Sequence, residues 1–235
     1  MTKKYVISFD GLNRSGKGTQ IEYLANHLSK KGFSTLIMRG DGSRKGDGSL
    51  GDPYSTWWQD IQPKLREIDR RGEFDRAAWK KSSDMLNWEL FQAYNNEMPQ
   101  KIKESDCEKG FILLDRSIIS KYFVNQRNPS NIRLEEILTF KSSQDKYERI
   151  TLPDVSFVLH VPKEVLLKRN ETVSDKPDKH GFRRRIISQY YDDFERITLG
   201  LKTDSLNIYH LNGNREENKI FKEVINYLAE VLRYV

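Results

Sequence analysis

The amino-acid sequence predicts a three-layer α/β/α fold built on a five-stranded parallel sheet. Five short runs of β-forming residues alternate with longer stretches of helical spacing, a pattern typical of a parallel sheet with helices on both faces. Most of these runs are continuously apolar, as strands are when both of their faces are covered. A length of 235 residues, of which 37% are hydrophobic, is sufficient for one full-sized domain.

The predicted elements follow one another along the whole chain. Polar stretches that contain Gly or Pro interrupt the pattern at residues 40–53 and 170–181, and we expect loops there. Too few residues precede the first loop to form a separate domain, so we expect a single domain over residues 1–235. The expected strands are residues 5–9, 34–38, 111–114, 155–161 and 206–211, and the clearest helical stripes lie within residues 21–28 and 220–232.

Composition excludes several classes of protein. No apolar run approaches the roughly 18 residues that a membrane helix needs, and we expect no signal peptide because Met1–Lys4 lead directly into the first strand. The single cysteine, Cys107, excludes an internal disulfide framework. A cytoplasmic enzyme is therefore the expectation. The net charge of +6 is compatible with a nucleic acid, an acidic membrane or a small polyanion as partner.

The strongest motif joins the first predicted strand to the first predicted helix. It reads Gly-x-x-x-x-Gly-Lys, and a position between strand and helix is what a phosphate-binding loop requires. Glycines let the backbone approach phosphate oxygens, N–H groups and the helix dipole attract them, and the lysine adds a cation for the β- and γ-phosphates. The expected phosphate-binding residues are Gly11, Leu12, Asn13, Arg14, Ser15, Gly16, Lys17, Gly18 and Thr19.

Two residues of this loop extend the prediction from binding to catalysis. Gly18 stands where such loops usually carry Ser or Thr, so we expect the Mg²⁺ contact to move to the next residue, Thr19, or to a bridging water. Arg14 lies inside the loop, where a cation would stabilise the transferring phosphoryl group as an arginine finger does. Lys17 and Arg14 are therefore expected to be catalytic.

Asp115 and Arg116 follow the third predicted strand. Ligands of open α/β sheets bind at the carboxyl ends of strands, so we expect both side chains beside the phosphate loop. A carboxylate there can hold Mg²⁺ directly or through water, and an arginine can hold an acceptor phosphate with two N–H groups. We expect both residues to be catalytic, with Asp115 also a metal ligand. An internal ion pair between them is the alternative interpretation.

These motifs resemble, in order, those of thymidylate kinases and related nucleoside-monophosphate kinases. Phe9–Gln20 is similar to the family's Phe-Glu-Gly loop, and Asp115-Arg116-Ser117 stands where the family has Asp-Arg-Tyr. The resemblance implies the P-loop kinase fold, the use of ATP and Mg²⁺, and a mobile lid at about residues 170–186. Weaker similarities involve Arg39 with the Gly-rich loop after it, Leu90–Asn95, Pro153-Asp154 and Phe182–Arg185.

The resemblance also implies roles for individual residues. Arg39 would approach the acceptor phosphate, and Phe91 would stack on the base. Basic residues of the lid would close over the triphosphate and exclude water, with Arg183 and Arg184 contacting the donor. The residues expected to bind the acceptor are Asp10, Arg39, Phe91, Asn95, Arg116, Ser120 and Asn125.

Departures from the family pattern leave the identity of the acceptor open. Asn95 stands where the family has Arg, and Asn13 stands where its loop has Asp. Ser117 replaces Tyr, and Asn125 replaces a Gln that bacterial members often have. The amides of Asn95 and Asn125 each offer a hydrogen-bond donor and an acceptor to a pyrimidine edge. A monophosphate other than dTMP is therefore an open alternative.

Together these features predict a kinase that transfers the γ-phosphoryl group of Mg·ATP to a (deoxy)nucleoside monophosphate, with dTMP as the preferred acceptor. A P-loop kinase with another acceptor or donor is the alternative, because Asp-Arg-Ser also resembles deoxynucleoside kinases and polyphosphate-dependent nucleotide kinases. A nucleic-acid-binding protein is a third interpretation, suggested by a pI near 9.2 and four Trp. The expected partners are small nucleotides, with no nucleic acid and no membrane, and the resemblance is compatible with a homodimer.

Overall fold

The computed structural model describes residues 5–39, 110–117, 119–120, 122–123, 152–172, 182–201 and 206–232. The chain divides into two compact units, the first comprising Met1–Met38, Asp106–Ser130 and Leu152–Val235, and the second Arg39–Ser105 and Asn131–Thr151. The helices and strands below belong to the first unit, apart from Arg39 at the end of the second strand. The single domain expected over residues 1–235 stays a prediction.

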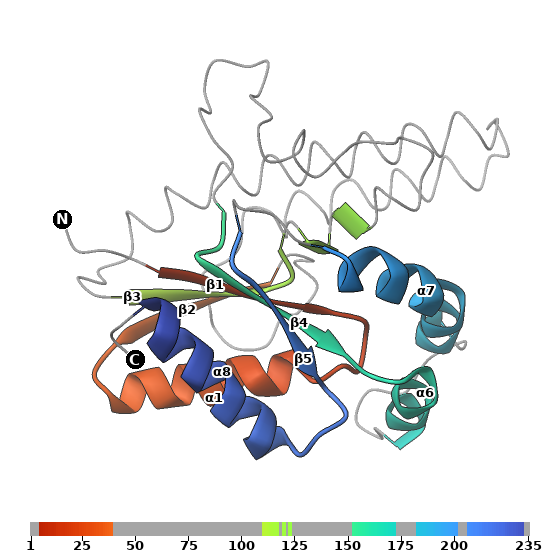
Figure 1. The fold of residues 1–235 in the computed structure, drawn as a ribbon. Coiled ribbons are helices and arrows are strands. Elements are labelled where there is room, and N and C mark those ends of the chain that lie inside the picture. The colour runs from red at the N-terminus through yellow and green to blue at the C-terminus, as the bar shows by residue number, and fades with distance from the viewer. Residues whose placement is uncertain are drawn as a thin grey trace, which may run out of the picture. The chain divides into compact units, whose positions relative to one another are not determined.

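A five-stranded parallel sheet forms the centre of this unit (Figure 1). The strand order is β2-β3-β1-β4-β5, so β1 lies in the middle with β3 on one side and β4 on the other. In the register of β1 and β3, Phe9 pairs with Asp115, which brings the two carboxyl ends side by side. The strands are β1 (Tyr5–Gly11), β2 (Ser34–Arg39), β3 (Gly110–Asp115), β4 (Val155–His160) and β5 (Ile208–Asn212).

Helices cover both faces of the sheet, as the continuously apolar strands predict. Helices α1 and α8 lie side by side on one face (Figure 1). On the other face α7 packs through Phe194, whose ring centroid lies 6.0 Å from that of His160 on β4, and α6 packs against α7. The three-layer α/β/α prediction is confirmed. The helices are α1 (Lys17–Lys30), α6 (Lys163–Thr172), α7 (Phe182–Leu199) and α8 (Glu217–Leu232).

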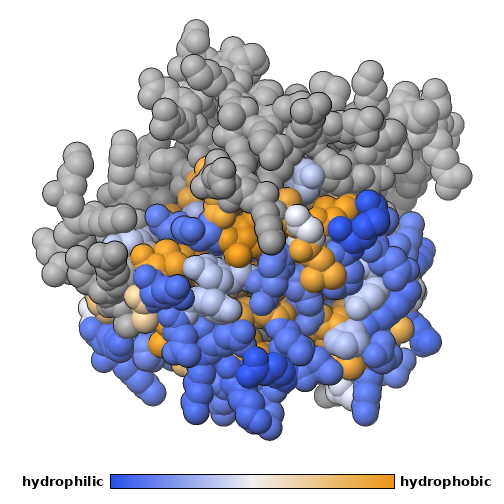
Figure 2. All heavy atoms as spheres, in the orientation of Figure 1, coloured by the Kyte–Doolittle hydropathy of each residue, from blue (hydrophilic) through white to orange (hydrophobic). Residues whose placement is uncertain are grey.

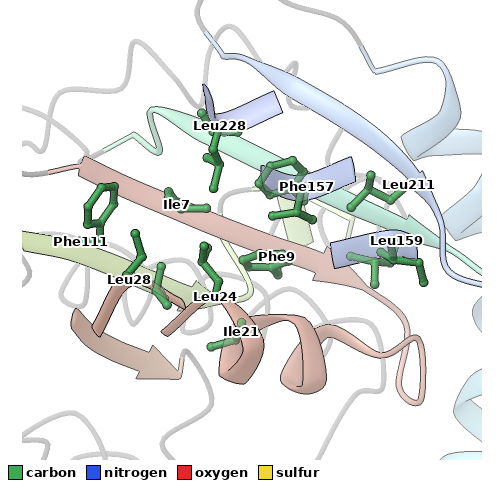
Figure 3. Close-up of a cluster of buried hydrophobic side chains, with 14 residues drawn as sticks. Ile7, Phe9, Ile21, Leu24, Leu28, Phe111, Phe157, Leu159, Leu211 and Leu228 are labelled. Atoms are coloured by element: carbon green, nitrogen blue, oxygen red, sulfur yellow. The ribbon is translucent and has the colours of Figure 1, made fainter. Parts of the chain in front are cut away.

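The main hydrophobic core lies between the sheet and the α1/α8 layer (Figure 3). Alternate residues of β1 and β4, such as Ile7, Phe9 and Phe157, point into it and are completely buried. From the helices it receives Leu24 of α1 and Leu228 of α8, which occupy the predicted stripes and are also completely buried. Each such side chain stabilises the fold by roughly 1.5–3 kcal/mol, so this core fixes where β1 delivers the loop that follows it.

The intervening residues of β1 are polar although they are buried. Ser8 and Asp10 face away from the core, toward the α7 side of the sheet, and neither side chain is exposed. The hydroxyl of Ser8 donates to Asp10 at 3.2 Å and lies 2.9 Å from the hydroxyl of Ser156 on β4. Polar groups in such a place need hydrogen-bond partners, and here they form a network under the carboxyl end of the sheet.

The structure adjusts the ends of several predicted elements. Strand β1 continues through Asp10 to Gly11, and β5 begins two residues later than expected, at Ile208. Helices α6 and α7 occupy both ends of the stretch expected to form the lid, since α6 ends at Thr172 and α7 begins at Phe182. The residues between them, 173–181, lie outside the described residues, and the lid itself stays a prediction.

On the face that Figure 2 shows, most of the described residues are hydrophilic, and hydrophobic residues form patches between them. Leu199, at the end of α7, is the exposed large hydrophobic residue among those that the structure describes, with 55% of its surface accessible. None of the described helices has the length and apolar character needed to cross a bilayer.

Candidate active site

The phosphate loop leaves β1 through a backbone conformation that excludes a side chain. Gly11 has φ +150°, and a Cβ added there would lie 2.6 Å from Ser15 Oγ and 3.0 Å from the Leu159 carbonyl oxygen. Gly16 precedes α1 with φ +96°, and no side chain caps that helix. The first turn of α1 therefore presents backbone N–H groups and the positive end of its dipole, as a phosphate site requires. The strand–loop–helix context predicted for this motif is confirmed.

Lys17 turns back over the loop that precedes it. Its side chain is largely buried, with 7% accessible, and Nζ donates to the carbonyl oxygens of Gly11 at 3.0 Å and Leu12 at 2.9 Å. These contacts hold the ammonium group within the curve of the loop. A cation held there can meet phosphate oxygens that approach the loop N–H groups.

Arg116 reaches the same loop from the neighbouring strand. Its Nη1 donates to the Gly11 carbonyl oxygen at 3.3 Å, and its Nη2 donates to Asn13 Oδ1 at 2.8 Å. Lys17 and Arg116 therefore share Gly11 O as an acceptor, which places both cations at the first residue of the loop. Arg116 has φ +81° and Arg14 has φ +70°, a left-handed backbone that is uncommon outside glycine and that clusters at functional sites.

Asp115 lies directly before Arg116, at the carboxyl end of β3. Its Oδ1 is buried and has no hydrogen-bond partner among the described residues, which is unusual for a buried carboxyl oxygen. Thr19 is half-buried in the first turn of α1. No group of three or more metal-binding side chains occurs in the described ranges, but Mg²⁺ at nucleotide sites takes one or two carboxylates together with phosphates and water. Asp115 and Thr19 fit that kind of coordination.

Asp10 is the most enclosed of the predicted site residues. It is completely buried, and its carboxyl oxygens accept hydrogen bonds from the segment that follows β3. Oδ1 accepts the backbone N–H groups of Ser117 at 2.9 Å and Ser120 at 3.1 Å together with the Ser120 hydroxyl, and Oδ2 accepts the Ser117 hydroxyl at 2.7 Å. The structure thus joins Asp10 and Ser120, two residues predicted to bind the acceptor, in an internal network.

Arg169 of α6 is a part of the site that sequence reasoning missed. Its guanidinium donates to the carbonyl oxygens of Arg14 at 3.3 Å and Gly213 at 3.0 Å. Gly213 follows β5, and a Cβ there would lie 3.1 Å from Ser15 O and 2.6 Å from Val161 Cγ2. The sequence signal that could have indicated this part of the site was the glycine directly after the last strand. The carboxyl ends of parallel strands lie together at the edge of the sheet where ligands bind.

The remaining predicted residues are placed only in part. Arg184 is exposed near the start of α7 and lies 3.5 Å from Glu171 of α6, while Arg39 and Arg183 are described by their backbone positions at the end of β2 and the start of α7. Phe91, Asn95 and Asn125 lie outside the described residues.

A second polar cluster lies between β4, β5 and α7, and we call it the histidine cluster. His160 Nδ1 lies 2.9 Å from Glu195 Oε2, and His160 Nε2 lies 2.9 Å from His210 Nδ1. The three side chains line a groove of about 310 Å³ together with Tyr191 and Asn212. Burial and the nearby carboxylate of Glu195 raise the pKa of Tyr191.

Known proteins resemble this chain over almost all of its length, although no family model matches it. It is 24% identical to the thymidylate kinase of Thermosipho africanus over 232 residues, covering 97% of this chain and 98% of that protein. It is 25% identical to the thymidylate kinase of a Thermoanaerobacter species over 231 residues, covering 96% of this chain and 98% of that protein.

A solved structure agrees with this sequence similarity. The thymidylate kinase of Candida albicans superposes with a TM-score of 0.58 at 19% identity, over 97% of this chain and 92% of that chain. This likeness shows the fold. The chain is therefore similar to thymidylate kinases over almost its whole length, which supports a thymidylate kinase-like P-loop kinase, an enzyme of the nucleoside-monophosphate kinase kind.

Proposed function

We propose that this enzyme transfers the γ-phosphoryl group of Mg·ATP to dTMP, which produces dTDP and ADP. One observation carries the proposal: Lys17 of the phosphate loop and Arg116 from the neighbouring strand contact the same carbonyl oxygen, Gly11 O, at 3.0 and 3.3 Å. A kinase has to bring two anionic substrates together, and two cations that follow neighbouring strands and meet at one carbonyl oxygen suit that task. The full-length thymidylate kinase relatives support dTMP as the acceptor.

The donor side consists of the phosphate loop and α1. Backbone N–H groups from Gly11 to the first turn of α1 bind the β- and γ-phosphates, and Lys17 exchanges its carbonyl contacts for phosphate oxygens. Arg14, held in a left-handed conformation within the loop, stabilises negative charge on the migrating group. Mg²⁺, when bound, neutralises charge on the phosphates, and Asp115 and Thr19 are the residues that would hold it.

The acceptor side centres on Arg116. Its guanidinium donates two hydrogen bonds to a phosphate in the geometry that it now directs at Gly11 O and Asn13 Oδ1. Arg39 assists at the same phosphate, Phe91 stacks on the base, and the amides of Asn95 and Asn125 read its edge. The contacts of Arg39 and Phe91 follow from the family resemblance, and those of the two amides follow from the donor and acceptor that each amide offers.

The chemistry needs no covalent intermediate on the enzyme. An oxygen of the acceptor phosphate forms a bond to the γ-phosphorus while the bond from that phosphorus to the β,γ-bridging oxygen breaks, and ADP leaves with that electron pair. The cations stabilise negative charge as it moves from the attacking oxygen of the acceptor to the β,γ-bridging oxygen. The lid expected at about residues 170–186, with Arg183 and Arg184, excludes water so that ATP is not hydrolysed.

A panel of acceptors tests this proposal. We expect ADP release from Mg·ATP to be fastest with dTMP when the wild-type protein is assayed with dTMP, dUMP, dCMP, UMP, CMP, AMP, GMP and thymidine. The thymidylate kinase of Candida albicans is described as having broad substrate specificity, so slower turnover of other monophosphates is compatible with the proposal. Faster phosphorylation of thymidine than of dTMP would indicate a deoxynucleoside kinase instead.

The donor is tested in the same assay. We expect ATP to serve and polyphosphate to be inactive, and ATP formation from ADP and polyphosphate would indicate the alternative donor. Folded protein that turns over none of these acceptors with either donor would refute the proposal.

A further inference from the structure

We propose that Asp10 and Ser117 are positioning residues that set the orientation of Arg116. This inference rests on the proposed function, because Arg116 is the residue that holds the acceptor phosphate there. It replaces the direct substrate contact that the sequence suggested for Asp10 with an indirect role. The structural basis is a closed path of hydrogen bonds from β1, through the segment after β3, and back to the phosphate loop.

The first step in the argument is that the backbone of Arg116 is fixed on both sides. On its N-terminal side, Asp115 is paired with Phe9 in the β1–β3 register, and the Arg116 N–H donates to Phe9 O at 3.0 Å. On its C-terminal side, the N–H groups of Ser117 and Ser120 both donate to Asp10. Arg116 is therefore held between two anchors on the same strand, β1.

The second step is that the conformation between these anchors is strained. Arg116 has φ +81°, a left-handed backbone conformation that is unfavourable for a residue with a Cβ. The hydrogen bonds on both sides compensate for this cost. If the C-terminal anchor is removed, Arg116 can relax to negative φ, and its side chain then leaves the direction of Gly11 O and Asn13.

The third step concerns the chemistry of Asp10. Among the described residues, its carboxyl oxygens accept hydrogen bonds from hydroxyl and backbone N–H groups, and the two oxygens receive different kinds of donor. Oδ1 accepts the two backbone N–H groups and the Ser120 hydroxyl, whereas Oδ2 accepts only the hydroxyls of Ser117 and Ser8. An asparagine can keep its oxygen at the Oδ1 position and donate to hydroxyls from the other, because hydroxyl groups rotate to accept. Backbone anchoring then survives the loss of charge.

Ser117 connects the carboxyl group to the turn that follows. Its hydroxyl donates to Asp10 Oδ2 at 2.7 Å and accepts the Ile119 N–H at 3.2 Å, so it ties the start of the helical turn at Ile119 to β1. Ser8 offers a matched comparison. It also donates to Asp10 Oδ2, but it lies on β1, and its hydroxyl otherwise lies 2.9 Å from that of Ser156 on β4.

The experiment measures the acceptor KM, kcat and the ADP dissociation constant for wild type, Asp10→Ala, Asp10→Asn, Ser117→Ala and Ser8→Ala. We expect Asp10→Ala to raise the acceptor KM at least about tenfold, since small misplacement of an orienting group has large effects. Ser117→Ala is expected to raise it about threefold. Asp10→Asn and Ser8→Ala should stay within about twofold, and the ADP dissociation constant should change little in all four variants.

Each outcome decides for or against the inference. If Asp10→Asn is as damaging as Asp10→Ala, the charge of Asp10 acts directly on substrate or metal, and the positioning role is wrong. If Asp10→Ala does not fold, the comparison of the acceptor KM of Ser117→Ala with that of Ser8→Ala decides. Equal KM values for these two variants would overturn the inference. Absence of turnover by wild type would overturn the proposed function and this inference together. Normal wild-type turnover with an unchanged KM in Asp10→Ala would overturn the inference alone.

Discussion

Two polar clusters lie on the α7 face of the same sheet, and they differ in what surrounds them. The first, the Asp10 cluster, comprises Ser8, Asp10, Ser117 and Ser120. It lies at the carboxyl ends of β1 and β3, its side chains are buried, and Asp10 accepts hydrogen bonds from serine hydroxyls and backbone N–H groups. The histidine cluster sits at the ends of β4 and β5, where the side chains of His160 and Glu195 keep 13% and 18% exposure beside an open groove.

The difference follows from the position of each cluster in the sheet. Beside β1, polar side chains can contact both the phosphate loop and the arginine after β3. At β4 and β5, the hydrogen bonds join the sheet to α7. We therefore expect changes near β1 to affect turnover, and changes at the histidine cluster to affect stability alone.

The largest effect should come from Lys17→Ala. Removing the ammonium group takes away a cation from the transferring phosphate, and we expect kcat to fall by roughly 10²–10³, as for other preorganised charge-stabilising groups. Steady-state ADP release measures it. Lys30→Ala, at the exposed far end of the same helix, is the matched control and should retain wild-type kcat. A Lys17→Ala enzyme with normal kcat would show that Lys17 does not take part in phosphoryl transfer.

Gly11→Ala should produce the next largest effect, on both activity and stability. The new Cβ would lie 2.6 Å from Ser15 Oγ in a backbone conformation unsuited to alanine, so we expect a loss of about 1–3 kcal/mol together with weaker nucleotide binding. Thermal unfolding and ADP titration measure the two. Gly200→Ala, next to the histidine cluster, meets nothing within 4 Å and should leave stability unchanged or raise it by up to about 1 kcal/mol. Equal losses in both variants would contradict this view of the loop.

Glu195→Ala tests the histidine cluster. It removes the partner of His160 Nδ1, and we expect about 1 kcal/mol of destabilisation in urea unfolding. Turnover and acceptor KM should remain at wild-type values. The control is Asp193→Ala, at the residue two positions before Glu195 on α7, which removes an exposed contact with Arg196. It should lower the free energy of unfolding by less than about 0.5 kcal/mol. A Glu195→Ala enzyme with a raised acceptor KM would show that the two clusters are coupled.

His27, in the second half of α1, should give the smallest effect and only in acid. Burial lowers the pKa of His27 from 6.5, and Lys31 and Lys30 lower it further. As the pH falls, His27 is therefore protonated at a higher pH in the unfolded chain than in the folded protein. Its contribution to the free energy of unfolding is complete above pH 6.5 and declines as the pH falls from there toward the pKa of His27 in the folded protein. His27→Gln should flatten the decline of Tm between about pH 6.5 and 5. An unchanged profile would assign that decline to other groups.

The sequence predicted the fold well because the relevant signals are local. Continuous apolar runs and helical stripes such as Leu24–Leu28 specify which elements form, and glycines at Gly11 and Gly16 specify how β1 turns into α1. Arg116 was predictable as a site residue because parallel strands bring their carboxyl ends together. The role of Arg169 was not, since its two partners, the carbonyl oxygens of Arg14 and Gly213, are 155 and 44 residues away along the chain.

By itself, the sequence determined the three-layer architecture, the phosphate loop and the cations placed at strand ends, because spacing and residue type encode these over short distances. Only the tertiary structure decided that Asp10 is enclosed by Ser117 and Ser120, and that His160 meets His210 across 50 residues. Burial is a property of packed elements rather than of a segment. The same carboxyl group binds ligands at an open edge and anchors backbone when neighbouring strands and turns close over it.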